Sequence, residues 1–167
     1  MKSTSTAIIA SVTLVHSWSV FGQCVVEFAA VAGTVSPPFV ATNGYVTQTI
    51  QTGVTNGGKA VYSFSITKAG QYAILAVVEA PNQNANSVFV NVDAEPKDPE
   101  MKWEIPVSTG FSTNGVCTSS GQRRYFDLTK GTHQIIVRGS EANVKLLHLR
   151  VMARPAAPTG LRMVSSP

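Results

Sequence analysis

The acidic side chains are too few and too scattered to indicate a hydrolytic active site. Hydrolysis of a glycosidic bond normally needs two carboxyl groups that flank the bond. The chain has only nine Asp and Glu residues, and four of them fall between residues 95 and 104. Pro96 and Pro99 interrupt this stretch, which is typical of a solvated loop. No pair of catalytic carboxylates can be recognised, and we predict that the protein is not an enzyme.

Other patterns approach known motifs without completing one. Residues 53–59 match the Gly-x4-Gly-Lys part of a phosphate-binding loop, but Ala60 stands where a Ser or Thr would hold magnesium, so a hairpin turn is expected. Residues 110–115 miss the Gly-x-Ser-x-Gly elbow by one position. His133 and His148 have no metal-ligand partner two or four residues further on, and no metal site is predicted. A Ser-His-Asp triad that includes Asp127 would have to assemble in space, and the spacing does not indicate one.

Aromatic and amide side chains in predicted loops are more informative. Aromatic rings stack on the apolar C–H faces of sugars, and amides both donate and accept hydrogen bonds to hydroxyls. Such residues occur in a polar loop at 82–86, after the acidic loop, in the long loop 108–121 and near the last strand. The candidate binding residues are Trp103, Phe111, Tyr125, Asn82, Asn84, Asn86 and Asn143. For Trp103 the alternative is burial in the core, because Trp is highly buried on average.

Composition and charge place the chain among globular domains. It has 167 residues, of which 44% are hydrophobic and 13% charged, against about 25% charged in typical domains. This length fits one domain. The formal net charge is +4, but the basic residues are scattered, and Arg123 and Arg124 are the only adjacent pair. A nucleic-acid partner is therefore not predicted, since such a partner requires a basic cluster or stripe.

The first 22 residues have the features of a signal peptide. Lys2 provides the positive start, residues 7–15 are almost continuously apolar, and Val20 and Gly22 suit the −3 and −1 positions of a cleavage site. The longest later apolar run, residues 73–78, is far shorter than the ~18 residues that span a membrane. We therefore expect a secreted product without a membrane partner. Gln23 stands before Cys24, where a lipid anchor requires a small residue.

Export would place the two cysteines, Cys24 and Cys117, in an oxidising compartment that permits a disulfide. Two unpaired thiols are the alternative, because sequence alone does not supply the required Cα separation. We predict a Cys24–Cys117 disulfide, which would join the first strand to the longest loop.

Alternation of apolar and polar residues dominates residues 23–153, and it predicts strands throughout. Turn-forming pairs such as Asn-Gly separate the runs. The predicted fold is all-β, an antiparallel jelly-roll-like β-sandwich over residues 23–153, followed by a Pro-Ala linker and a truncated tail at 154–167. The predicted strands are residues 24–31, 45–50, 59–66, 70–79, 87–93, 101–107, 122–127, 132–139 and 143–152.

Several segments resemble one known family. The chain is similar to galactose-binding-like β-sandwiches, and in particular to carbohydrate-binding modules of families 6 and 35. The resemblance rests on the order of residues 79–82 (Glu-Ala-Pro-Asn), 86–93 (Asn-Ser-Val-Phe-Val-Asn-Val-Asp), Trp103, 126–137 (Phe-Asp-Leu-Thr-Lys-Gly-Thr-His-Gln-Ile-Ile-Val) and Glu141.

The resemblance also implies a calcium site that this chain does not match. Such modules often begin with two Glu separated by one residue and carry an Asp in the last strand. Here Glu27 is followed by Ala29 at the second position, and residues 142–151 contain no acid. Calcium takes about six to eight oxygen ligands, so we predict that the site is lost or weak and that no cofactor is bound. The tail at 158–162 resembles the entry to a fibronectin type III domain.

The resemblance implies a secreted, non-catalytic carbohydrate-binding module whose partner is a polysaccharide or other glycan. The alternative is a structural or adhesive module of a multidomain surface protein, which contacts neighbouring domains and has no sugar ligand. Burial of both Trp103 and Phe111 would favour that alternative.

Overall fold

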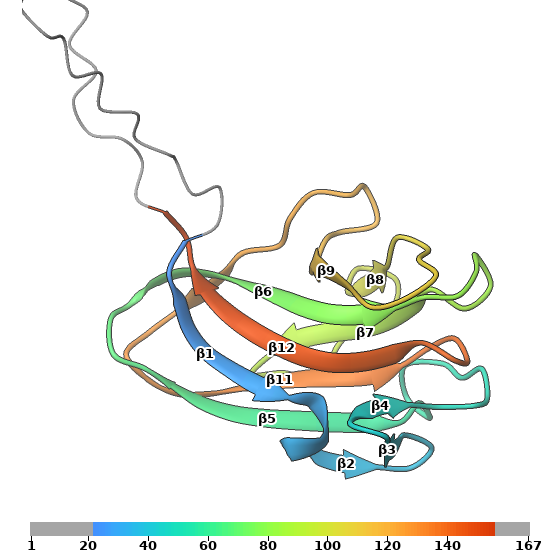
Figure 1. Cartoon of the computed structure of the whole chain (residues 1–167). Helices are drawn as coiled ribbons and strands as arrows, with labels where there is room; N and C mark the ends of the chain where they lie inside the picture. The colour runs from blue at the N-terminus through green and yellow to red at the C-terminus, as the bar shows by residue number, and fades with distance from the viewer. Residues whose placement is uncertain (1–21, 156–167) are drawn as a thin grey trace, which may run out of the picture.

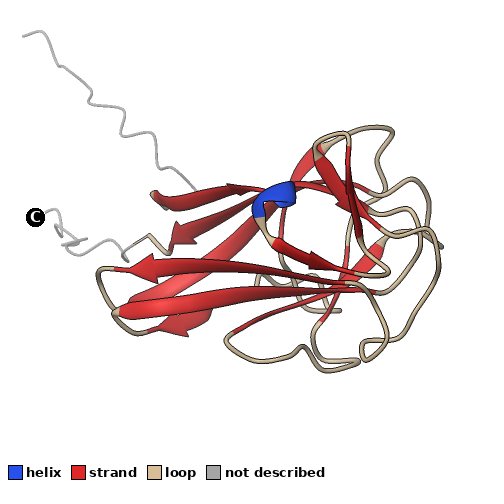
Figure 2. Ribbon diagram, turned by 90° about the horizontal axis from the view of Figure 1, so that it is seen from below, coloured by secondary structure: helices blue, strands red, loops and turns tan. Residues whose placement is uncertain are grey.

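The structure, a computed structural model, describes residues 22–155. These residues form two antiparallel sheets packed face to face, with one 3-10 turn, η1 (Ala30–Ala32), and no α-helix (Figures 1 and 2). The predicted all-β sandwich is confirmed. Within the described range, no helix is long and apolar enough to span a membrane. Residues 1–21 of the predicted signal peptide and residues 156–167 of the predicted tail lie outside that range.

One sheet, sheet A, has seven strands and the other, sheet B, has five. The strands of sheet A are β1 (Cys24–Ala29), β3 (Val40–Thr42), β4 (Tyr45–Thr47), β6 (Gly70–Glu79), β9 (Ser112–Gly115), β10 (Phe126–Leu128) and β12 (Lys145–Ala153). The strands of sheet B are β2 (Thr34–Ser36), β5 (Lys59–Ile66), β7 (Ser87–Val92), β8 (Lys102–Glu104) and β11 (Gly131–Gly139).

The centre of sheet A is the antiparallel pair β6 and β12, which runs from Tyr72 opposite Ala153 to Glu79 opposite Lys145. The other edge of β12 is shared by β1 and β4, and the other edge of β6 by β10 and β9. Sheet B has the order β2-β5-β11-β7-β8. Both ends of the described chain leave at one end of the sandwich, here called the base (Figure 1). The loops 80–86 and 140–144 lie at the opposite end, the tip.

The long strands match their predicted ranges, whereas the short edge strands do not. The bounds of β5, β6, β7 and β11 agree with prediction to within one residue. β2, β3 and β9 have three or four residues each, which is too short for alternation to be recognised. The predicted strand 101–107 shrinks to β8, since Pro106 has no N–H to continue the ladder. The predicted strand 122–127 is replaced by β10, which begins at Phe126.

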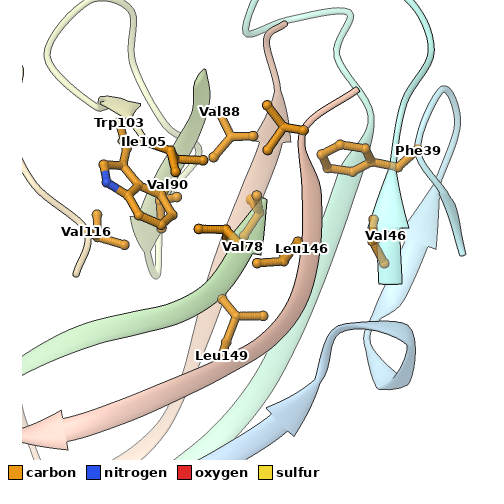
Figure 3. A pocket seen from close by; sticks show the side chains of 12 residues that line it. Phe39, Val46, Val78, Val88, Val90, Trp103, Ile105, Val116, Leu146 and Leu149 are labelled. Atoms are coloured by element: carbon orange, nitrogen blue, oxygen red, sulfur yellow. The ribbon is translucent and has the colours of Figure 1, made fainter. Parts of the chain in front are cut away.

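The core lies between the sheets and contains Trp103. Alternate residues of β6, β11 and β12 point inward, and Trp103 of β8 is 1% exposed at the tip side of this core. Figure 3 shows its indole among aliphatic side chains from both sheets, around a void of about 10 Å³. A void of that size holds at most one water molecule, and its lining is apolar. Trp103 is therefore a core residue, and its predicted role as a sugar-stacking residue is wrong.

Replacing Trp103 by alanine should destabilise the fold strongly. The variant loses the transfer energy of the indole and leaves a cavity, which costs about 3–5 kcal/mol of unfolding free energy. Urea unfolding followed by circular dichroism measures the loss. Phe111→Ala is the control, because Phe111 is 42% exposed, and its unfolding free energy should change by about 0.5 kcal/mol or less. Equal stabilities of the two variants would contradict the burial of Trp103.

A buried histidine joins the end of β7 to the start of β11. The Nδ1 atom of His133 lies 2.6 Å from Asp93 Oδ2, and Nε2 lies 2.8 Å from the Thr129 carbonyl oxygen. Both partners accept hydrogen bonds, so both ring nitrogens donate, which only the protonated imidazolium can do. The Asp93 hydrogen bond, followed by the Thr129 hydrogen bond, raises the pKa of His133 above its usual 6.5. The ring also packs against Phe64 at 5.7 Å between centroids.

This arrangement predicts a pH-dependent stability. Because the folded-state pKa of His133 is raised, its contribution is fully present below the unfolded value of 6.5 and is lost as the pH rises through the folded value. The urea midpoint should therefore fall as the pH is raised above 6.5. His133→Gln should flatten this dependence between about pH 6 and 8. A wild-type midpoint that stays constant or rises over this range would contradict the prediction.

Candidate functional site

The structure does not bring the three predicted aromatic residues together. Trp103 is buried, whereas Phe111 is 42% exposed and Tyr125 is 39% exposed. Tyr125 lies at the base, next to Phe126, which pairs with Tyr72 near the start of β6. Phe111 lies at the tip, next to β9, which pairs with the far end of β6. Since β6 has 10 residues, the two exposed rings are roughly 20 Å apart and cannot contact one sugar residue.

Phe111 instead belongs to a row of side chains across the outer face of sheet A at the tip. We call Tyr45, Glu79, Phe111 and Lys145 the tip cluster. Lys145 of β12 is the register partner of Glu79 of β6. The strands that carry or adjoin the cluster pair in the order β4, β12, β6 and β9, so the four side chains lie side by side. On β4, β6 and β12 the residue next to each cluster residue is buried in the core. Since successive side chains of a strand point to opposite faces of the sheet, the cluster residues point outward.

The tip cluster combines two aromatic rings with an ion pair. The rings of Tyr45 and Phe111 are 6.1 Å apart between centroids and tilted by 51°. Lys145 Nζ lies 2.7 Å from Glu79 Oε1 and 5.6 Å from the centre of the Tyr45 ring. The hydrogen bond to Glu79 raises the pKa of Lys145, which therefore stays protonated at neutral pH. The cluster offers an exposed ring face beside a cationic donor and an anionic acceptor.

Local turn chemistry positions this cluster. Asn43 and Gly44 have φ values of 47° and 84°, which is the two-residue turn that joins β3 to β4 and places Tyr45 at the first position of β4. Asn143 has a φ of 66°, and its backbone N donates to the Gln48 carbonyl oxygen at 2.7 Å. This bond holds the start of β12, and hence Lys145, beside the end of β4.

The predicted amide residues fall into two groups. Asn82 and Asn84 are exposed in the loop 80–86, where Asn82 Oδ1 accepts from the Asn84 backbone N at 2.9 Å. Asn143 is exposed at the tip, two residues before Lys145. Asn86 is only 9% exposed, and its side chain donates to another side chain of the same loop at 3.3 Å. Asn86 therefore shapes the loop, whereas the other three have accessible side chains.

Sequence reasoning missed three members of the tip cluster. Tyr45, Glu79 and Lys145 lie at the ends of predicted strands, and no local motif marks them as binding residues. The Asn-Gly pair at 43–44 predicts a two-residue hairpin turn and so places Tyr45 at the start of a strand, but it does not mark the side chain as a binding residue. Glu79 and Lys145 are close together only because β6 pairs with β12, and the sequence does not specify this pairing.

Two adjoining hollows, of about 500 and 320 Å³, lie beside β9 and share Leu75 and Thr113. The larger is lined in addition by Cys24, Glu27 and residues of β12. The smaller reaches Trp103, which is 1% exposed. Neither hollow therefore presents an accessible aromatic ring on which a sugar could stack.

The predicted Cys24–Cys117 disulfide is wrong, since both cysteines are free. Cys24 Sγ donates to the Val26 carbonyl oxygen, and Cys117 Sγ to that of Gly115. Cys24 lies on β1 and Cys117 follows β9, and β12 and β6 lie between these strands. Three strand spacings amount to roughly 14 Å, about twice the largest Cα separation that a disulfide can bridge.

Comparison with known proteins supports the fold assignment. No family model and no curated protein matches the sequence. Among solved structures, a family 35 carbohydrate-binding module from Clostridium thermocellum has a TM-score of 0.56 at 15% identity, with 75% of this chain and 95% of that chain covered. The module CBM6cm-2 of Cellvibrio mixtus lichenase 5A, in complex with cellotriose, has a TM-score of 0.52 at 16% identity, with 78% and 98% covered.

Larger enzymes contain the same fold as one part. The Podospora anserina GH26-CBM35 β-(1,4)-mannanase has a TM-score of 0.58 at 13% identity, with 80% of this chain covered. This chain spans 28% of that enzyme's length. The described residues thus have the galactose-binding-like β-sandwich fold found in carbohydrate-binding modules of families 6 and 35.

The residues around Glu27 do not fit the calcium ion that the resemblance implies. Glu27 of β1 pairs with Arg150 of β12, whose guanidinium lies 3.0 Å from Oε1, and His148 Nδ1 lies 3.6 Å from the same atom. The hydrogen bond from Arg150 lowers the pKa of Glu27. Within residues 22–155 no group of three metal-binding side chains occurs. The Arg150 guanidinium therefore already neutralises the one carboxylate and occupies the place where a divalent cation would bind.

Calcium should have no effect on the stability of this domain. A calcium ion bound only to the folded state would stabilise it by about 4 kcal/mol at 1,000 times its Kd. Because we expect no calcium to bind, the melting temperature should be the same, to within about 1 °C, in millimolar calcium and in excess EDTA. A rise of several degrees on addition of calcium would show that a calcium site exists despite the Glu27–Arg150 pair.

Proposed function

We propose that this protein is a secreted, non-catalytic module that binds a polysaccharide at the tip cluster. The observation that carries this proposal is the contact between Tyr45, on β4, and Phe111, in the loop before β9, beside the Lys145–Glu79 pair. Two contacting aromatic rings next to a charged donor and acceptor suit a sugar, whose C–H faces are apolar and whose edges carry hydroxyls. The exposed amides Asn82, Asn84 and Asn143 are further candidates for hydrogen bonds at the rim.

The composition of the cluster supports binding without a covalent step. Glycosidases place two carboxyl groups on opposite sides of the bond that they cleave. Only one member of the tip cluster, Glu79, carries a carboxyl group, and the Lys145 ammonium holds it at 2.7 Å. The cluster is thus suited to holding a glycan, with no acid and base pair to cleave it.

The placement of the chain ends supports a tethered module. The described chain begins and ends at the base, where the Ala153 backbone N donates to the Gln23 carbonyl oxygen at 2.9 Å. The tip cluster lies at the opposite end of β6 and β12. A neighbouring domain joined through the Pro-Ala linker would therefore leave the tip open to a polymer. The solved structures with this fold include a module in complex with cellotriose, which agrees with this proposal.

Removing either ring of the cluster should weaken binding. Phe111→Ala and Tyr45→Ala each lose a stacking surface, and we expect the affinity to fall by about 10-fold, equivalent to about 1.4 kcal/mol. Tyr125→Ala is the matched control, because Tyr125 is equally exposed but lies at the base. Affinity electrophoresis in gels that contain single polysaccharides, followed by calorimetry on the best one, measures the change.

Two outcomes would contradict the proposal. If wild-type protein is retained by no neutral or charged polysaccharide, the module has no glycan ligand and the structural alternative stands. If Tyr125→Ala loses as much affinity as Phe111→Ala, the glycan binds elsewhere than at the tip cluster.

A further inference from the structure

We infer that the Lys145–Glu79 ion pair makes the tip cluster selective for uncharged glycans with adjacent hydroxyl groups, and this inference rests on the proposed function. The two rings supply affinity for any sugar face, because stacking does not depend on the substituents at the sugar's edge. The ion pair beside the rings is the part of the cluster that can distinguish a hydroxyl from a carboxylate or a sulfate ester.

The pair is accessible and incompletely satisfied. The side chain of Lys145 is 33% exposed and that of Glu79 is 17% exposed. The ammonium group has three N–H donors, of which one serves Glu79 Oε1. Among the described residues, no donor gives a hydrogen bond to Glu79 Oε2. One acceptor and at least one donor thus remain side by side at the edge of the rings.

This pattern matches two neighbouring hydroxyls of an uncharged sugar. One hydroxyl donates to Glu79 Oε2, and the next accepts from Lys145 Nζ, so that neither charge has to leave its partner. A sugar carboxylate or sulfate would instead face the negative Glu79 and would compete for a lysine that is already neutralised. Like charges at short range cost free energy, and the pair therefore acts against charged ligands.

The nearest other charges at the tip do not change this balance. Lys102 and Glu141 form a second pair at 3.8 Å, and Glu141 Oε2 also accepts from the Asn86 backbone N at 2.7 Å. Their side chains are 31% and 14% exposed. Each of these two pairs is neutral as a whole, so neither adds a net positive charge that would attract an anionic polymer.

The variant that tests the inference is Glu79→Gln. It keeps an oxygen acceptor of the same shape at this position but removes the negative charge, which leaves the Lys145 ammonium without its counter-ion. Retention by anionic polysaccharides should then rise, by about fivefold or more at low ionic strength, and the gain should disappear at about 0.5 M salt, where charges are screened within a few ångströms. A purely structural role for Glu79 could only reduce retention.

The matched control is Glu95→Gln on the outer face of sheet B. Glu95 is paired with both Lys59 and Arg138, so this variant frees two cations and changes the net charge of the protein by the same amount. If net charge alone governed binding to anionic polymers, Glu95→Gln would increase retention as much as Glu79→Gln. We expect it to behave like the wild type.

Lys145→Gln is the second test variant. It removes the cation of the pair, so anionic polymers should retain it less than they retain the wild type.

The probes are pairs of polymers that share a backbone, of which one member is neutral and the other anionic. Affinity gels contain hydroxyethylcellulose or carboxymethylcellulose, and methyl-esterified or de-esterified pectin. Wild-type protein should prefer the neutral member of the pair it binds, and Glu79→Gln should lose that preference. Melting temperatures of all variants confirm that they are folded.

The outcomes separate this inference from the proposed function. If wild type and Phe111→Ala are equally unretained by every polymer, the proposed function fails, and the inference fails with it. If wild type is retained and Phe111→Ala is not, but Glu79→Gln keeps the wild-type preference, only the inference fails. A wild-type preference for the anionic member, or an equal gain with Glu95→Gln, also overturns it.

Discussion

The register between β6 and β12 is the constraint on which the rest of the structure depends. With Lys145 opposite Glu79, every second residue of β6 faces sheet B, and so do Leu146, Leu149 and Val151 of β12, where an irregularity in register between Leu146 and His148 interrupts the alternation. A slip of one residue would turn the inward-facing aliphatic side chains to solvent, so burial of the core fixes this register strongly. The same register brings the ammonium of Lys145 to the carboxylate of Glu79. The site is therefore a consequence of packing on the opposite face of the same strands.

The two faces of this sandwich divide the aromatic residues between stability and binding. Trp103 offers the largest ring, and its place on the three-residue strand β8 directs it into the space between the sheets. Its indole fills the tip side of the core, and this burial supports the loops above it. The proposed binding site uses Tyr45 and Phe111 instead, which project from edge elements and contact each other. A ring on a short edge strand or loop is free to be exposed because fewer neighbouring residues cover it.

Ion pairs connect the strands of the outer face of sheet A. Glu27 and Arg150 join β1 to β12, and Glu79 and Lys145 join β12 to β6. Exposed pairs of this kind contribute little to stability, about 0–1 kcal/mol each. Their effect is local. The Glu27–Arg150 pair neutralises the carboxylate that a calcium ion would need, and the Glu79–Lys145 pair forms the polar part of the tip cluster. The charge pattern of the strands thus determines what this face can bind more than how stable it is.

The sequence by itself determined the secondary structure class, the long strands and the turn residues, because alternation and Asn-Gly pairs are local signals. β5 and β6 match their predicted ranges, and Phe111 was identified as an exposed ring. Only the tertiary structure decided that Trp103 is buried, that Cys24 and Cys117 are separated by two strands, and that Tyr125 lies at the opposite end from Phe111. The physical reason is that these facts depend on which strands are neighbours, and the pairing of strands distant in sequence is set by the burial of a whole core.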